Sequence, residues 1–204
     1  RGFTTKHRPT AIAVLGDPLA IAYSSGEIAV GVVGFGPPTV VKRSEKVNVP
    51  VGCLAWCDSG VLVAAGVPDT GDGEIALFHM TPAGVELVSV VDLLDAPVAL
   101  VAHPSQAGVL DASGSAQIFE VGLFGMESMD MVPNLTGLHS IGAGLLLARE
   151  DSAPVVAYRL EGGKAQRHGA LPKARAAVAA RGGLLAVEHT DSRVALLRYE
   201  LCED

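Results

Sequence analysis

The stretch that decides the fold is SGVLVAAGVPDTGDGEIALFH, residues 59–79. It contains a Ser-Gly turn, a short apolar run, a loop of Gly, Pro and Asp, and a second apolar run. Glycine and aspartate supply the dihedral angles that tight turns need, and short apolar runs between such turns are typical of buried β-strands. The same order of turn, strand, loop and strand occurs five times along the chain. We therefore interpret the whole sequence as repeats of one small β-unit.

Each unit begins with a nearly continuous apolar run, as expected of a strand covered on both faces. These first runs are residues 11–15, 52–56, 98–102, 138–141 and 176–180. Second runs follow a tight turn, at 19–23, 61–65, 109–110, 145–148 and 184–187. Third runs follow a polar loop, at 27–30, 74–78, 116–119, 154–158 and 193–197. More polar fourth segments follow at 39–44, 85–90, 127–131 and 165–168. Hydrophobicity that falls from the first to the fourth strand is typical of a propeller blade, whose outer strand is an edge guarded by charges.

The two ends of the chain predict how the repeats close. The last unit ends after three strands, and residues 2–8 form a polar segment that we expect to supply the missing outer strand. Strands from both termini would then close a ring and remove its open edge. The prediction is a single domain, residues 1–204, folded as an all-β, five-bladed β-propeller. A different all-β solenoid or sandwich is the alternative.

On this repeat pattern the chain resembles β-propellers of the WD-repeat or YVTN-like kind over nearly its whole length. The WD signature itself is absent, because the sole tryptophan, Trp56, is followed by Cys57. The resemblance implies the propeller architecture without close WD-repeat kinship.

The composition places the chain among proteins that do not cross a membrane by helices, because no apolar run approaches the ~18 to 20 residues required. The three cysteines are Cys53, Cys57 and Cys202, with no CxxC pair. Four residues apart on a strand, Cys53 and Cys57 would lie about 13 Å from each other, too far for a disulfide. We expect free, buried thiols and a cytoplasmic location. Because the chain begins without Met, removal of an earlier segment stays open.

Enzymatic chemistry finds little support. Five-bladed glycoside hydrolases would place acid and base carboxylates on the inner strands. The five first runs contain neither Asp nor Glu, and Asp17 and Asp58 stand in the turns beyond them. We therefore predict no catalytic residue and a protein that is not an enzyme.

The sequence gives equally little support for metal binding. His103 and His139 fall on or beside consecutive first strands, but two imidazoles without a third ligand make a poor site. The Asp-rich loop, residues 69–74, lacks the length and the terminal glutamate of an EF-hand, so we interpret it as a turn. No metal and no cofactor are predicted.

Charge is distributed unevenly along the chain. Residues 47–148 contain no Lys or Arg and eleven Asp or Glu, a formal charge of −11, whereas the remainder carries 15 basic and 11 acidic residues, or +4, so the total is −7. In a ring, this becomes an acidic arc facing a basic rim. The candidate acidic contacts, all at connections between second and third strands and so on one face, are Asp69, Asp72, Glu74 and Asp111. The candidate basic rim is Lys6, Arg8, Lys42, Arg43, Lys46 and Arg167.

Three functions are consistent with this pattern. The first is a non-enzymatic protein-interaction module or complex subunit whose acidic arc docks a basic protein partner, since complementary fields orient and accelerate docking. The second is binding of nucleic acid or another anionic surface through the basic rim, although no aromatic stacking residues are interleaved with it. The third is binding of a small molecule or sugar, with or without hydrolysis, in a propeller pocket.

Overall fold

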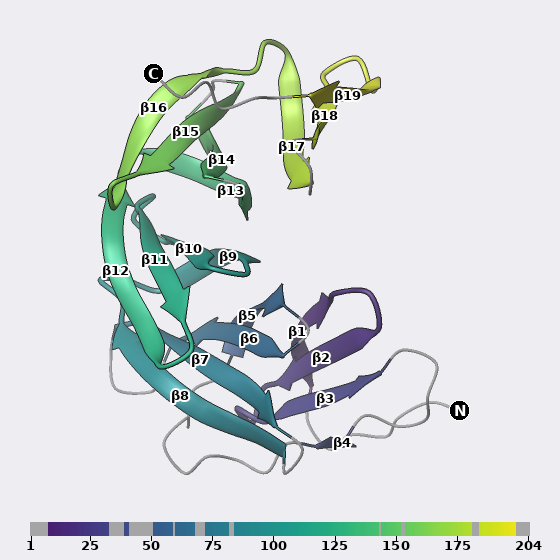
Figure 1. Ribbon diagram of the computed structural model, residues 1–204, viewed down its shortest axis with the longest axis vertical. Helices are drawn as coiled ribbons and strands as arrows, with labels where there is room; N and C mark the ends of the chain where they lie inside the picture. The colour runs from purple at the N-terminus through teal and green to yellow at the C-terminus, as the bar shows by residue number, and fades with distance from the viewer. Residues whose placement is uncertain are drawn as a thin grey trace.

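The computed structural model describes residues 8–32, 39–40, 51–58, 60–67, 72–81, 84–142, 144–151, 154–180 and 184–198, and shows an all-β protein (Figure 1). Within these residues there is no helix, and nineteen strands form five antiparallel sheets. In each sheet, consecutive strands are neighbours, so the chain runs as a series of meanders. No helix in the described ranges is long and apolar enough to span a bilayer.

The strands have the following bounds. The first sheet contains β1 (Pro9–Val14), β2 (Pro18–Tyr23), β3 (Ile28–Val32) and β4 (Thr39–Val40). The second contains β5 (Val51–Asp58), β6 (Val61–Gly66), β7 (Glu74–Thr81) and β8 (Gly84–Asp92). The third contains β9 (Pro97–His103), β10 (Gln106–Asp111), β11 (Ala116–Gly122) and β12 (Gly125–Val132). The fourth contains β13 (Leu135–Gly142), β14 (Leu145–Glu150), β15 (Val155–Glu161) and β16 (Lys164–Ala170). The fifth contains β17 (Ala174–Ala180), β18 (Leu184–His189) and β19 (Val194–Arg198).

The sequence repeats correspond to these sheets, and the all-β prediction is confirmed. The distribution of burial differs from the expectation that first strands are the most enclosed. Middle strands such as β6 and β10 are buried along nearly their whole length, whereas every residue of β9 is partly or fully exposed. A middle strand has a hydrogen-bonded neighbour on each side and a sheet on each face, which encloses it more completely than a strand at a sheet margin.

The five sheets follow one another around a crescent, with first strands such as β5, β9 and β13 on its inner side and β8, β12 and β16 on its outer side (Figure 1). Four apolar clusters join them, one between each pair of consecutive sheets. The sheets therefore pack face to face, and most core residues belong to an interface between two sheets.

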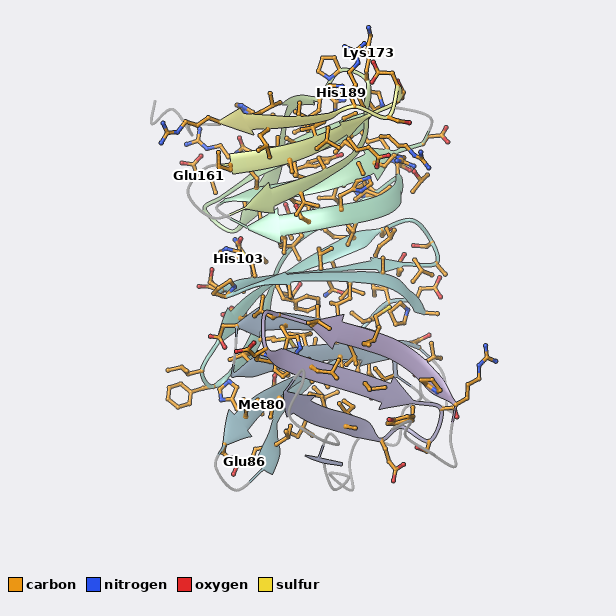
Figure 2. The ribbon with its side chains drawn as sticks, turned by 90° about the vertical axis from the view of Figure 1, so that its right-hand side faces the viewer. Met80, Glu86, His103, Glu161, Lys173 and His189 are labelled. Carbon is orange, nitrogen blue, oxygen red and sulfur yellow. The ribbon has the colours of Figure 1, made fainter. Side chains whose placement is uncertain are left out.

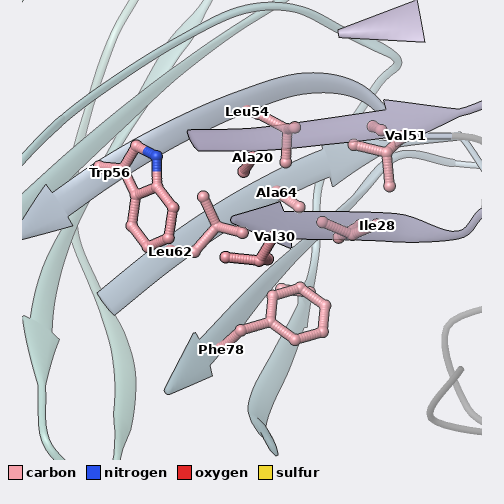
Figure 3. Packing of buried hydrophobic residues seen from close by; sticks show 11 residues of the cluster. Ala20, Ile28, Val30, Val51, Leu54, Trp56, Leu62, Ala64 and Phe78 are labelled. Carbon is pink, nitrogen blue, oxygen red and sulfur yellow. The ribbon is translucent and has the colours of Figure 1, made fainter. Parts of the chain in front are cut away.

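The cluster between the first two sheets shows how this packing is specified (Figure 3). Trp56 of β5 and Leu62 of β6 lie opposite each other in register, and both are buried with Phe78 of β7. The indole Nε1 of Trp56 donates a hydrogen bond to the carbonyl oxygen of Ala13 in the first sheet, at 3.2 Å. This bond satisfies the one polar atom of the indole while its rings fill the interface.

Closure into a ring is not seen among the described residues, in which the first and fifth sheets stand at the two ends of the crescent (Figure 1). The fifth sheet has three strands there. Residues 2–8, predicted to provide its fourth strand, lie outside the described residues except for Arg8.

The connections divide between two faces of the crescent. Because the strands alternate in direction, connections between second and third strands share one face with the connections from one sheet to the next; we call this the loop face. Backbone hydrogen bonds join these loops, from Leu93 N to Gly73 O at 2.7 Å and from Thr190 N to Lys173 O at 2.9 Å. The opposite face carries residues such as His103 and Glu161, which lie on the left flank in Figure 2.

Candidate functional site

The loop face of the second sheet carries four acidic residues in or beside two neighbouring loops, which we call the acidic patch: Asp72, Glu74, Asp92 and Asp95. Glu74 begins β7 and is the direct register partner of Asp92 at the end of β8. Asp72 and Asp92 are exposed, and Glu74 and Asp95 are half-buried. Two of the four, Asp72 and Glu74, are predicted contact residues; they stand two positions apart in the sequence, and their role as contacts stays a prediction.

Gly73 allows the two loops of the acidic patch to approach each other. A Cβ atom at this position would lie 2.5 Å from the carbonyl oxygen of Asp95 and 2.7 Å from Cδ of Pro97, closer than real Cβ contacts. Glycine is therefore required for the contact that places Asp72 beside Asp95.

The acidic patch has no cationic partner in the described structure. The four ion pairs among the described residues all lie between residues 150 and 193. This agrees with the absence of Lys and Arg from residues 47–148. Asp95 Oδ1 accepts a hydrogen bond from Ala96 N at 2.7 Å, and among the described residues no ion pair neutralises any of the four carboxylates.

The other two predicted acidic contacts differ from this pair. Asp69 lies outside the described residues. Asp111, at the end of β10, is 8% exposed, and its Oδ1 accepts hydrogen bonds from Ser113 N, Ser113 Oγ and Ser115 N at 3.0, 2.6 and 2.9 Å. Such a carboxylate holds a turn together, so we assign Asp111 to its turn and leave it out of the acidic patch.

Sequence reasoning did not select Asp92 and Asp95 as contact residues. Both belong to the Lys-free and Arg-free half, but they precede a first strand instead of a third strand. The available signal was topological, because in an antiparallel meander the loops between sheets share a face with the loops between second and third strands.

A basic cavity lies on the loop face where the fourth and fifth sheets meet. We call it the basic pocket. Its volume is about 480 Å³, and it is lined by Arg149, Asp151, Pro154, Lys173, Ala174, Arg175 and Thr190. The guanidinium of Arg149 donates a hydrogen bond to the carbonyl oxygen of Arg175, which fixes one cation against the wall. Arg175 also forms an ion pair, with its Nη1 atom 3.7 Å from Oε1 of Glu188. Three cations against one lining carboxylate leave the pocket positively charged (its Lys173 is labelled in Figure 2).

Arg149 of β14 also affects a histidine on the neighbouring strand, His139 of β13. Burial and the positive charge of Arg149 lower the pKa of His139, so this imidazole favours its neutral form. The Nε2 atom of His139 is buried without a hydrogen-bond partner in the structure. His103 packs instead against Gly142, where an added Cβ would lie 2.6 Å from the imidazole Cδ2. Within the described part of the chain, no three His, Cys, Asp or Glu residues gather as a metal site would need.

The predicted basic rim is described at two of its six positions. Arg8 is exposed, and its carbonyl oxygen accepts a hydrogen bond from Ser24 N at 2.8 Å. On β16, Arg167 donates hydrogen bonds to both oxygens of Glu150, at 2.8 and 3.2 Å. Lys6, Lys42, Arg43 and Lys46 lie outside the described residues. The rim as a binding surface stays a prediction.

Tyr158 completes the Arg167–Glu150 pair by donating a 2.6 Å hydrogen bond to Glu150 Oε1. The hydrogen bonds from Arg167 and Tyr158 lower the pKa of Glu150. Burial, followed by the hydrogen bond to Glu150, raises the pKa of Tyr158. This network joins β14, β15 and β16 and stabilises the fourth sheet.

The two described cysteines are free thiols, as predicted, with Cys57 buried and Cys53 half-buried. Burial, with a smaller contribution from the adjacent carboxylate of Asp58, raises the pKa of Cys57 to about 12. A thiol that holds its proton so firmly is a poor nucleophile at neutral pH, so Cys57 is a core residue.

Comparison with known proteins finds the fold alone. No family model matches the chain, and no curated protein matches it by sequence. Among solved structures, it is similar to Atg21 in a complex of KlAtg21 with the coiled coil of AgAtg16, with a TM-score of 0.68, 13% identity, and coverage of 98% of this chain and 68% of that one. It is similar to Sqt1 of Saccharomyces cerevisiae, with a TM-score of 0.64, 14% identity, and coverage of 97% and 64%. It is also similar to a protein of Bacteroides uniformis provisionally described as a 6-phosphogluconolactonase, with a TM-score of 0.59, 18% identity, and coverage of 94% and 66%.

These similarities support a β-propeller-like arrangement of the sheets. The chain spans about two thirds of the length of each of these structures. One of the three carries an enzyme description and another was solved bound to a protein, and function does not follow from fold at such identities.

Proposed function

We propose that this protein is an interaction module whose acidic patch binds a basic segment of a partner protein. The observation that carries the proposal is the group formed by Asp72, Glu74, Asp92 and Asp95 on the loop face of the second sheet, without an ion-pair partner among the described residues. Acidic residues gathered on one face attract cations, and a Lys- or Arg-rich segment can form charge-assisted hydrogen bonds with their carboxylates.

The rest of the molecule supports the same role. The basic pocket lies on the same loop face, so this face carries negative charge over the second sheet and positive charge over the fifth. Such a dipolar surface orients an approaching partner, and its effect weakens with salt. The Atg21 structure contains a bound protein segment, which is a fold-level analogy for this use of the sheets.

Binding of a labelled deca-lysine peptide tests the proposal by fluorescence anisotropy. The test variant carries Asp72→Lys, Glu74→Lys and Asp92→Lys. The matched control carries Glu86→Lys, Glu120→Lys and Glu127→Lys, which changes net charge equally at three exposed positions of the same acidic half on the opposite face. We expect the test variant to raise the Kd about tenfold or more and the control about threefold or less. If the two variants raised the Kd equally, the peptide would be responding to net charge, and the acidic patch would not be a specific binding site.

Binding of a small anion is a second candidate function, favoured by the basic pocket. Its three cations and the hydroxyl of Thr190 suit a phosphate ester or a carboxylate. We expect a sugar phosphate, but not the unphosphorylated sugar, to raise the Tm, and Arg149→Gln to abolish the shift. Arg159→Gln is the matched control, because Arg159 pairs with Glu161 at 3.2 Å toward the opposite face. If sugar phosphate still raises the Tm of Arg149→Gln, it does not bind in this pocket.

Binding of nucleic acid through the basic rim is tested separately, by an electrophoretic mobility shift assay at low salt.

The closed five-bladed ring is the finer architectural hypothesis that accompanies this function. The three-stranded fifth sheet of the described structure leaves a position for a fourth strand beside β19, which residues 2–8 would occupy. Closure of the ring predicts that the first and fifth sheets cover each other. Hydrogen exchange tests this hypothesis, because β1 and β19 should then be as well protected as β6 and β10, and faster exchange at both strands would contradict closure.

A further inference from the structure

The basic pocket contains a carboxylate that none of its cations neutralises. Asp151 lines the cavity together with the three cations, and it is exposed. No ion pair within the described part of the chain includes Asp151. The guanidinium of Arg175 is paired instead with Glu188, which does not line the cavity. The pocket therefore presents an unpaired negative group beside positive groups to the same ligand.

The segment that carries Asp151 is held by a neighbouring strand. The hydroxyl of Thr136, on β13, is hydrogen-bonded to the carbonyl oxygens of Arg149 and Asp151, at 3.4 and 3.3 Å. This contact fixes the backbone at the end of β14, which supplies one of the cations and the one carboxylate among the described lining residues. The fold thus sets the spacing of the two residues before a ligand arrives, which lowers the cost of binding.

Lys173 belongs to the connection between the fourth and fifth sheets (top of Figure 2). Its φ of 59° lies in the left-handed region, which lysine rarely adopts and glycine adopts readily. A hydrogen bond from Ala174 N to Leu171 O at 3.1 Å closes the turn, and Lys173 O accepts another from Thr190 N at 2.9 Å. Residues held in such conformations are frequent at ligand-binding sites, so the strain at Lys173 supports a binding role for the pocket.

The unpaired carboxylate makes the pocket selective among anions. A phosphate or carboxylate group in the cavity is attracted by the three cations and repelled by Asp151. An anion that also carries an ammonium group can place this group beside Asp151, which replaces the repulsion by an attraction. A charge that one ligand leaves unpaired and another pairs is a general source of specificity.

We propose that the basic pocket binds a zwitterionic small molecule, whose phosphate or carboxylate group contacts the cations and whose ammonium group contacts Asp151. The cavity, about 480 Å³, is within the size range of small-molecule sites. This inference rests on the anion binding proposed above for the pocket and adds the chemical class of the ligand. It is independent of the acidic patch, which lies over the second sheet.

Matched pairs of phosphate esters test the ligand class. Ethyl, butyl and hexyl phosphate are compared with the same esters carrying a terminal amine, by isothermal titration calorimetry at low salt. The chain lengths cover a range of separations between phosphate and amine, so the result does not depend on one separation. We expect the best amino ester to bind about three- to fivefold more tightly than its amine-free counterpart, the gain expected of an exposed ion pair.

Two substitutions assign this gain to a residue. Asp151→Asn removes the charge and keeps the size of the side chain, so it should weaken binding of the amino ester, strengthen binding of the amine-free ester and bring the two Kd values together. The matched control is Asp191→Asn, at an exposed residue of the same face that pairs with Arg193 at 2.9 Å and does not line the cavity. The control changes net charge equally and should leave the ratio of the two Kd values as in the wild type.

Three results would overturn the inference. Equal affinity of the wild type for the amino and amine-free esters at every chain length would show that Asp151 does not select the ligand; if Arg149→Gln then weakened binding of both, anion binding itself would stand. A preference for the amino ester that persists in Asp151→Asn would place the amine elsewhere. If no phosphate ester bound, the anion-binding role of the pocket would be wrong together with this inference.

Discussion

Replacing Leu62 with alanine should strongly destabilise the protein, because Leu62 is fully buried between the first and second sheets. The change removes three carbon atoms, which at about 0.8 kcal/mol each corresponds to about 2.4 kcal/mol of lost burial. Trp56 and Phe78 pack in the same cluster from a rigid sheet and limit collapse into the space. The cavity term brings the expected loss in free energy of unfolding to about 3 to 4 kcal/mol.

Urea unfolding followed by tryptophan fluorescence measures this loss with a local probe. Trp56 is the sole tryptophan and is the register partner of Leu62, so the signal arises at the altered interface. The matched control is Leu123→Ala, at a leucine that is 71% exposed, which should change stability by about 0.5 kcal/mol or less. If Leu62→Ala cost no more than this control, the face-to-face packing of the two sheets would be wrong.

Three further predictions concern single side chains. Tyr158→Phe should lower stability at neutral pH by about 1 to 2 kcal/mol. The pKa of Glu150 is lowered from its ordinary value of 4.5, so its ionised form stabilises the folded protein at a pH above that value, and this contribution is lost as the pH falls. Urea unfolding should therefore show that the variant loses less stability than the wild type between pH 7 and pH 3. Identical pH profiles would contradict the network. Asp111→Ala should lower the free energy of unfolding by about 1 to 2 kcal/mol, as measured by thermal unfolding, because its turn hydrogen bonds are lost. Its binding of deca-lysine should be unchanged. Weaker binding at unchanged stability would show that Asp111 belongs to the acidic patch. Cys57, with its pKa raised to about 12, should react with iodoacetamide far more slowly in the folded protein than in urea, and equal rates by peptide mass spectrometry would show that it is not buried.

The strands were predictable from sequence because short apolar runs alternate with turn residues at regular intervals. The run at residues 61–65 and the run at 74–78 became β6 and β7 almost without change. Strand β10 begins at Gln106, three residues before the predicted run at 109–110, because Ala107 and Gly108 also pair with β9 and such small residues give a weak strand signal.

The candidate site was predictable in part. The absence of Lys and Arg from residues 47–148 identified the acidic region, but the turn hydrogen bonds of Asp111 depend on a local geometry that composition does not encode. The basic pocket was missed because Arg149 precedes Lys173 by more than twenty residues and meets it through the packing of two sheets. Such convergence arises from tertiary structure, and no spacing along the chain reports it.

Hydrogen exchange tests most directly the central claim, that the five sheets pack face to face through four apolar layers. We expect peptides from β6, β10 and β14 to exchange slowly, because a sheet packs on each of their faces. Peptides from β16, whose residues are all partly or fully exposed, should exchange much faster. Equal protection of β16 and the three central strands would contradict face-to-face packing as the source of the protection.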